Sequence, residues 1–200
     1  MNNYKEVEGD LIKLSLQGAF DVITHCTNCF CTQKAGIAPQ MVKAFGTDRF
    51  KMEAEKYRGS MNKLGTIDYE SGVINNGIYL HYSADASLKI LTVINTYGQF
   101  GMGYDKNGKP PVDYEALTLC MRKINFTFKD KHIGLPGLIC CGLAGGDETI
   151  VKAIIKKELK DMQITIVYLP GMLKPDVSIT KNKQDKTEIS TGDNLFGAQG

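Results

Sequence analysis

The sequence predicts an α/β domain in which a mixed sheet lies between helical layers. Three observations support this fold class. Strand-like apolar runs alternate with helix-like amphipathic runs, the last strand-like run follows a helix, and a glycine-rich turn at 141–147 joins a strand to a helix. A chain of 200 residues suits one such domain with a sizeable core.

The first elements are two strands and two helices. A short strand ends and turns at 7–11, and β-forming apolar residues predict a second strand over 20–25. After a polar, cysteine-rich loop, a helix opens over 36–46, where Pro39 is tolerated in the first turn and a glycine ends the helix. The charged run over 49–57 predicts a second helix on the surface.

The middle of the chain combines a strand pair, a buried strand and a helix. Residues 64–82 alternate in polarity, and Asn75-Asn76-Gly77 is a tight-turn signal between the two strands. The apolar run over 89–96 predicts a buried strand. The segment 97–111 is rich in glycine and proline and predicts a long loop, whereas apolar residues at helical spacing predict a helix over 112–128.

The last elements flank the glycine-rich turn. Residues 133–140 form an apolar strand-like run, 148–160 an amphipathic helix and 163–169 the final strand. From about residue 173 to residue 200 the chain is polar and too poor in apolar residues to order itself alone. The sequence therefore predicts a domain over 1–172 and a flexible tail over 173–200.

Charge and hydropathy exclude several classes of protein. The formal net charge is +2 and no basic block of five residues occurs, so electrostatics do not favour a nucleic-acid partner. No apolar stretch approaches the roughly 20 residues that span a bilayer. The first residues lack the apolar core of a signal peptide. We therefore expect a cytoplasmic protein with no membrane partner.

Six cysteines raise the question of metal binding or disulfides. They stand at positions 26, 29, 31, 120, 140 and 141. His25-Cys26-x-x-Cys29-x-Cys31 invites a zinc interpretation, but a structural zinc site needs four ligands and a second separated pair is missing. Reduced thiols that line a core and a pocket fit a cytosolic chain better. No metal and no cofactor are expected.

Glycines and polar residues follow three of the expected strands: Asn28, the segment 96–103, and 142–147. In open α/β sheets, ligands bind at the carboxyl ends of strands. Glycines let backbone N–H groups approach an anion, and the helix that follows adds unpaired donors and a partial positive charge. The sequence therefore predicts a phosphate cradle over 142–146. Asp147 at its end is placed either for chemistry or to cap the helix.

Four segments occur in the order seen in macro domains: Gly9-Asp10, Asn28 followed by Gly36-Ile37-Ala38, residues 95–100, and residues 141–147. Over about 4–170 the chain resembles the small stand-alone branch with ADP-ribose 1″-phosphate phosphatases and terminal ADP-ribose protein glycohydrolases, common in bacteria and their phages. The resemblance implies a three-layer α/β/α macro domain with a mixed central sheet.

The resemblance also implies a binding site for ADP-ribose. Asp10, with Leu11 beside it, would accept a hydrogen bond from the adenine amino group, unless it is only a turn aspartate. Asn28 would lie near the distal ribose, unless it satisfies backbone groups of its loop. Phe100 would pack on the same ribose, or simply be buried. Two facing loops would bind the diphosphate with backbone donors: Gly36, Ile37 and Ala38 on one side, and Gly142, Leu143, Ala144, Gly145 and Gly146 on the other.

Two residues are candidates for catalysis. His25 matches a histidine of the phosphatase branch, and His25 or Asp147 would orient water or protonate the leaving oxygen. A structural strand-end histidine and a helix cap are the alternatives. Glycohydrolases of the terminal type use a nucleophilic lysine before the long loop, and 95–100 contains none. Glu148 also stands where relatives often carry tryptophan.

These features predict a monomeric hydrolase that removes the 1″-phosphate of ADP-ribose 1″-phosphate, in the host cytoplasm if the chain is phage-encoded. One alternative is a hydrolase that cuts an ester or glycosidic bond of an ADP-ribosylated protein. Another is a binder of ADP-ribose or a related nucleotide signal without turnover. A dinucleotide oxidoreductase is disfavoured, because the glycine loop comes late and the required acidic residue does not follow it.

Overall fold

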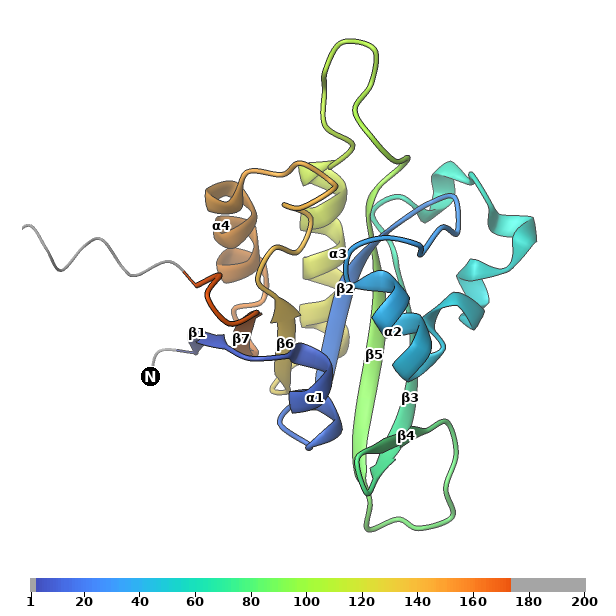
Figure 1. Cartoon of the computed structure of the whole chain (residues 1–200), viewed down its shortest axis with the longest axis vertical. Coiled ribbons are helices and arrows are strands. Elements are labelled where there is room, and N and C mark those ends of the chain that lie inside the picture. The colour runs from blue at the N-terminus through green and yellow to red at the C-terminus, as the bar shows by residue number, and fades with distance from the viewer. Residues whose placement is uncertain (1–2, 174–200) are drawn as a thin grey trace, which may run out of the picture.

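A computed structural model, which describes residues 3–173, shows a seven-stranded sheet with α-helices on both faces (Figure 1). This confirms the expected three-layer α/β/α architecture. In chain order the strands and α-helices are β1 (Tyr4–Glu8), α1 (Leu11–Leu16), β2 (Val22–Asn28), α2 (Ala38–Phe45), β3 (Ile67–Asn75), β4 (Ile78–Leu80), β5 (Lys89–Gln99), α3 (Tyr114–Thr127), β6 (His132–Pro136), α4 (Glu148–Glu158) and β7 (Gln163–Tyr168).

The sheet is mixed, with the strand order β1-β7-β6-β2-β5-β3-β4. The first five strands of that order are parallel to one another, whereas β3 is antiparallel to β5 and β4 is antiparallel to β3. The predicted tight turn joins β3 to β4. Asn76 and Gly77 have φ values of 49° and 77°, which suit a two-residue hairpin loop.

Two hydrophobic cores lie on opposite faces of the sheet because neighbouring strand residues point to opposite sides. On β2, Val22 packs into the core beneath α3 and α4, while Ile23 packs into the core beneath α1 and α2. Figure 1 shows α1 and α2 on the near face. Leu117 and Val151 anchor the first core from its helices, and both are buried.

The prediction of a charged surface helix over 49–57 is wrong. The chain instead makes short 3₁₀ turns at Thr47–Arg49, Lys51–Glu53, Glu55–Tyr57 and Met61–Lys63. Phe50 and Ala54 between them are extended, with ψ of 156° and 142°. This backbone places Phe50 in the α1/α2 core and buries Glu53, which one straight amphipathic helix with a solvated charged face would not do.

Other boundaries shift by a few residues. The short helix α1 was not expected, because six residues are too few to show a helical period. Strand β6 ends at Pro136 rather than at 140, since the chain turns there and Ile139 N–H donates to the Pro136 carbonyl at 3.0 Å.

No helix in residues 3–173 combines the length and apolar character that a membrane crossing requires. The predicted tail over 173–200 lies outside the described residues apart from Leu173, which packs against the α3/α4 core.

Candidate functional site

The loops that carry the predicted site residues meet at one edge of the sheet. Strands β1, β7, β6, β2 and β5 are parallel, so their carboxyl ends point the same way. We call this side of the molecule the carboxyl edge. Its loops span residues 9–10 after β1, 29–37 after β2, 100–113 after β5 and 137–147 after β6. In Figure 1 the long loop between β5 and α3 projects at the top of this edge.

Contacts between these loops hold the edge together. Cys29 N–H donates to the Phe100 carbonyl at 3.0 Å, and the Phe30 and Phe100 rings meet edge to face with centroids 5.2 Å apart. Phe100 is half-buried by this contact, and its packing on a ribose stays a prediction. On the other side, Val112 N–H donates to the Ala144 carbonyl at 3.1 Å. The β5–α3 loop therefore touches the loop that leads to α2 and the glycine loop after β6.

The N-terminus of α2 offers backbone donors without partners. Ile37 is the N-cap and makes no side-chain cap hydrogen bond. Among the described residues, no hydrogen bond is made by the N–H groups of Gly36, Ile37 and Ala38. The helices α1, α3 and α4, by contrast, each begin with an aspartate cap. Unpaired N–H groups at a helix N-terminus are suited to an anion.

The glycine loop after β6 is fixed by its own backbone bonds. Gly145 N–H donates to the Gly142 carbonyl and Gly146 N–H to the Cys140 carbonyl, both at 2.9 Å. The N–H groups of Leu143 and Ala144 make no hydrogen bond within residues 3–173. A Cβ at Gly142 would meet nothing within 4 Å, so this part of the loop faces open space. These features fit the predicted cradle.

Asp147 caps α4. Its Oδ1 accepts hydrogen bonds from the N–H groups of Thr149 at 2.8 Å and Ile150 at 3.1 Å, and its own N–H donates to the Tyr114 hydroxyl at 2.8 Å. The cap interpretation is thus confirmed. The side chain is exposed, and Oδ2 takes no part in the cap. The catalytic role of Asp147 remains a prediction.

Asp10 caps α1 in the same manner. Its Oδ1 accepts from Ile12 N–H at 2.9 Å and Lys13 N–H at 3.1 Å, while the residue stays partly accessible. Leu11 is different, because its side chain is 4% exposed and belongs to the α1/α2 core. This burial argues against a ligand contact by the Leu11 side chain.

Asn28 organises the loop after β2. Its Nδ2 donates to the Thr32 carbonyl at 2.7 Å, and its Oδ1 accepts from Phe30 N–H at 3.0 Å. The residue is buried. These bonds match the alternative in which Asn28 satisfies backbone groups of its loop, and they shape the segment that leads to α2.

His25 lies in the interior rather than at the surface. Its side chain has no exposed area, and Nε2 lies 2.8 Å from Asn95 Oδ1. Asn95 in turn donates to the Thr47 carbonyl at 2.9 Å. Nδ1 has no hydrogen-bond partner among the described residues. The predicted catalytic role of His25 is not supported, because a residue with no accessible surface does not reach a substrate.

Burial of His25 predicts an acid-sensitive fold. Burial lowers its pKa to about 4 from 6.5, although the Asn95 hydrogen bond raises it. The unfolded chain takes up a proton near pH 6.5 and the folded chain does not, so stability is complete above that pH and falls below it. Because of His25, we expect the free energy of unfolding to fall by about 2 kcal/mol between pH 7 and pH 5. Urea unfolding at both pH values measures this difference.

The control for this prediction is a second histidine. His81 is exposed and pairs with Glu70 at 3.3 Å, and an exposed pair contributes little to stability, so His81→Asn should keep most of the pH dependence, whereas His25→Asn should lose most of it. An unchanged pH dependence in His25→Asn would contradict a neutral, buried His25.

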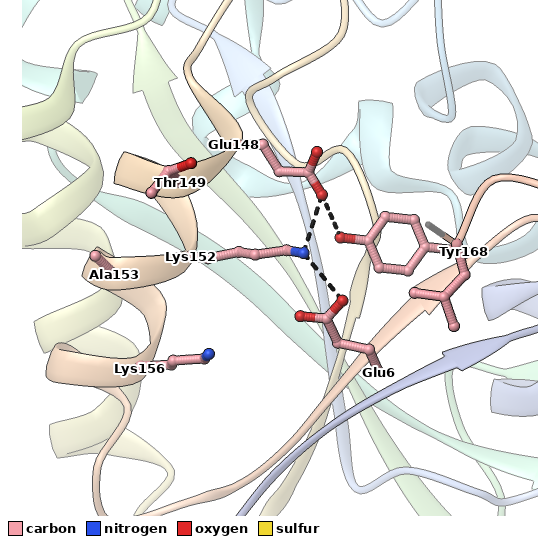
Figure 2. Close-up of a pocket in the computed structure, with 8 residues that line it drawn as sticks. Glu6, Glu148, Thr149, Lys152, Ala153, Lys156 and Tyr168 are labelled. Atoms are coloured by element: carbon pink, nitrogen blue, oxygen red, sulfur yellow. Dashed lines mark hydrogen bonds and ion pairs between the residues drawn. The ribbon is translucent and has the colours of Figure 1, made fainter. Parts of the chain in front are cut away.

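A pocket lies beside α4, on the β1–β7 side of the sheet. Its volume is about 450 Å³, and its lining comprises Glu6, Glu148, Thr149, Lys152, Ala153, Lys156, Tyr168 and Leu173. Figure 2 shows Lys152 Nζ between two carboxylates, 2.9 Å from Glu6 Oε2 and 3.0 Å from Glu148 Oε1. The Tyr168 hydroxyl donates to Glu148 Oε1 at 2.6 Å.

These polar groups bind one another. Burial, with the Glu148 hydrogen bond, raises the pKa of Tyr168 to about 12, so its hydroxyl stays a donor at neutral pH. The i,i+4 spacing of Glu148 and Lys152 is a sequence signal for part of this network, and the expectations above did not use it.

A second hollow, of about 340 Å³, is formed by residues 100–105 and 109–113 of the β5–α3 loop at the carboxyl edge.

The cysteines form no metal site within residues 3–173. All six are free thiols. Among the described residues, no group of three or more histidine, cysteine, aspartate or glutamate side chains is placed to hold a metal ion.

Comparison with known proteins places the fold in a class. No family model matches the sequence. The chain is 29% identical over 171 residues to an uncharacterized 17.5 kDa protein from the tk-vs intergenic region of Enterobacteria phage T4. The aligned region covers 82% of this chain and 94% of the phage protein.

Solved structures are similar over most of the chain. Thermosipho africanus DarTG in complex with ADP-ribose superposes with a TM-score of 0.61 at 16% identity, covering 88% of this chain and 44% of that one. A macrodomain protein from Streptomyces coelicolor gives 0.51 at 21% identity, covering 82% and 97%. The fold is therefore that of a macrodomain. This confirms the resemblance drawn from the four sequence segments.

Proposed function

We propose that this macrodomain binds ADP-ribose at the carboxyl edge and hydrolyses the 1″-phosphate of ADP-ribose 1″-phosphate. One observation carries the binding proposal. The uncapped N-terminus of α2 and the free N–H groups of Leu143 and Ala144 follow two neighbouring parallel strands, β2 and β6. The bound ADP-ribose in the DarTG structure, which has the same fold, supports the same ligand class.

The chemistry of a diphosphate suits this pair of loops. A diphosphate carries negative charge on two linked phosphorus centres, so two sets of N–H donors can each bind one centre. The donors of Gly36–Ala38 add the partial positive charge of the α2 N-terminus. The Oδ2 of Asp10, which takes no part in the α1 cap, is available to accept a hydrogen bond from the adenine amino group.

Hydrolysis is assigned to Asp147. Its Oδ2 lies outside the α4 cap, and the exposed side chain allows it to orient a water molecule toward the phosphorus atom. His25 takes no part in this proposal because it is buried.

Binding without turnover is the second candidate. Two observations favour it: Asp147 already serves as a helix cap, and His25 has no exposed surface. A pure binder would use the same donors for the diphosphate and would need no group to activate water.

Asparagine at position 147 separates the two candidates. Asparagine caps helices about as well as aspartate, but it cannot take a proton from water. We expect Asp147→Asn to reduce phosphate release from ADP-ribose 1″-phosphate by about 100-fold or more, while calorimetry shows ADP-ribose affinity within twofold or so of wild type. The melting temperature should also be preserved.

Asp113→Asn is the matched control. Asp113 caps α3 through a bond from Ala116 N–H, so the same exchange is made at another helix start. It should leave turnover unchanged. Tight ADP-ribose binding without phosphate release by the wild-type protein would contradict the proposed phosphatase activity, and absence of ADP-ribose binding would contradict the proposed function as a whole.

A further inference from the structure

A buried lysine contacts a cysteine beside the carboxyl edge. The side chain of Lys63 has no exposed area, and its Nζ lies 3.1 Å from Cys31 Sγ. Nζ also donates to the Met52 carbonyl at 2.7 Å and lies 3.5 Å from Glu53 Oε1. Cys31 belongs to the loop 29–37 that leads to α2, and it is only half-buried. Cys31 is thus partly open to solvent, and its sulfur contacts the Lys63 amine.

The surroundings of Lys63 are equipped to take its proton. Glu53 is the carboxylate partner of Lys63, and its side chain is 1% exposed. Glu53 Oε1 accepts the Tyr97 hydroxyl at 2.6 Å, while Oε2 has no hydrogen-bond partner among the described residues. In the resting protein Lys63 and Glu53 form an ion pair, and transfer of the ammonium proton to Glu53 during the reaction gives the neutral amine. The neutral amine is the nucleophilic form.

We propose that Cys31 and Lys63 form an oxidative modification site, in which a peroxide joins the two side chains through one oxygen atom as an N–O–S bridge. Thiols that are reachable by oxidant are the ones that enter the oxidation ladder. The short Nζ–Sγ separation leaves room for one bridging atom without movement of the backbone.

The proposed chemistry balances with two peroxide molecules. The first oxidises the Cys31 thiol to a sulfenic acid and is itself reduced to water. The second converts the neutral Lys63 amine to a hydroxylamine and releases water. The hydroxylamine oxygen then bonds to the Cys31 sulfur, and the sulfenic hydroxyl leaves with the hydroxylamine proton as a third water. The S–O bond of the product is reopened by a thiol reductant.

The bridge would tie the loop after β2 to the 3₁₀ turn Met61–Lys63. Asn28 holds that loop at one end by a hydrogen bond to the Thr32 carbonyl. The unpaired backbone N–H groups at the start of α2 lie at its other end. Oxidation would therefore restrict the motion of one wall of the carboxyl edge.

Peptide mapping of the full-length protein tests the proposal. The protein is treated with hydrogen peroxide or with dithiothreitol, alkylated, digested and analysed by mass spectrometry. We expect a linked peptide pair joined at Cys31 and Lys63, heavier than the two peptides by one oxygen less two hydrogens. Dithiothreitol should remove it. Cys31→Ser should abolish the pair, whereas Cys141→Ser, at another half-buried thiol, should retain it.

Recovery of oxidised Cys31 as a sulfinic or sulfonic acid with Lys63 unmodified would overturn the proposal, as would a disulfide between Cys31 and another cysteine. Both outcomes are read from the wild-type protein, so they do not depend on whether a variant folds. The readout is independent of ADP-ribose, and its failure leaves the proposed function untouched.

Discussion

Glu53→Gln is expected to lower the free energy of unfolding by about 3–5 kcal/mol, the cost of leaving a buried charge without its partner. Lys63 and Glu53 are both fully buried, and their ion pair is 3.5 Å long. Glutamine keeps the size of the side chain and an acceptor for the Tyr97 hydroxyl, so the change isolates the charge. The melting temperature should fall by on the order of 10 °C in a thermal unfolding scan.

Glu55→Gln is the matched control. Glu55 lies two residues away and pairs with Arg58 at 3.6 Å, but its side chain is 83% exposed. Exposed pairs contribute little, so this variant should change stability by less than about 0.5 kcal/mol. Equal effects of the two substitutions would show that Lys63 carries no charge in the folded protein.

Gly146→Ala is expected to weaken ADP-ribose binding at least tenfold and to cost about 1–3 kcal/mol of stability. A Cβ at Gly146 would lie 2.5 Å from the Cys140 carbonyl oxygen, which is the acceptor of the Gly146 N–H. The obstacle is backbone, so the loop itself must move. Such movement would misplace the N–H groups of Leu143 and Ala144. Calorimetry with ADP-ribose and urea unfolding measure the two effects.

Gly142→Ala provides the comparison within the same loop. A Cβ at Gly142 meets no atom within 4 Å, and φ of Gly142 is not positive. This variant should fold with nearly wild-type stability. Loss of stability of the same size in both variants would mean that the loop is sensitive to any added methyl group, and that the contact with Cys140 does not explain the effect of Gly146→Ala.

Local signals allowed much of the fold to be predicted. The hairpin at Asn76-Gly77, the start of α2 near Pro39 and the cap of α4 by Asp147 each depend on residues a few positions apart. The same is true of the alternation of strands and helices. For that reason the architecture and the loops of the candidate site could be predicted from short stretches of sequence.

Burial depends on contacts between segments that are distant in the sequence, so which polar side chains are buried could not be predicted from local patterns. His25 ends a strand-like run and could be placed at a surface, but its partner Asn95 lies on β5, and Thr47, which accepts from Asn95, lies in the 3₁₀ segment. Glu53 lies in the charged run over 49–57, which is typical of a solvated helix, and Lys63 follows that run. Only the folded chain brings Tyr97 and Cys31 to them.

The α/β class, the order of the elements and the glycine loop are properties of the amino-acid sequence alone, because they follow from periodicity, turn chemistry and helix capping within short segments. Which polar groups are satisfied depends on the tertiary structure. The fold leaves the donors at the start of α2 free, engages Oδ1 of Asp147 in a cap, and removes His25 from the surface. The physical reason is that hydrogen-bond partners and solvent exposure are set by strand pairing and packing between segments tens of residues apart.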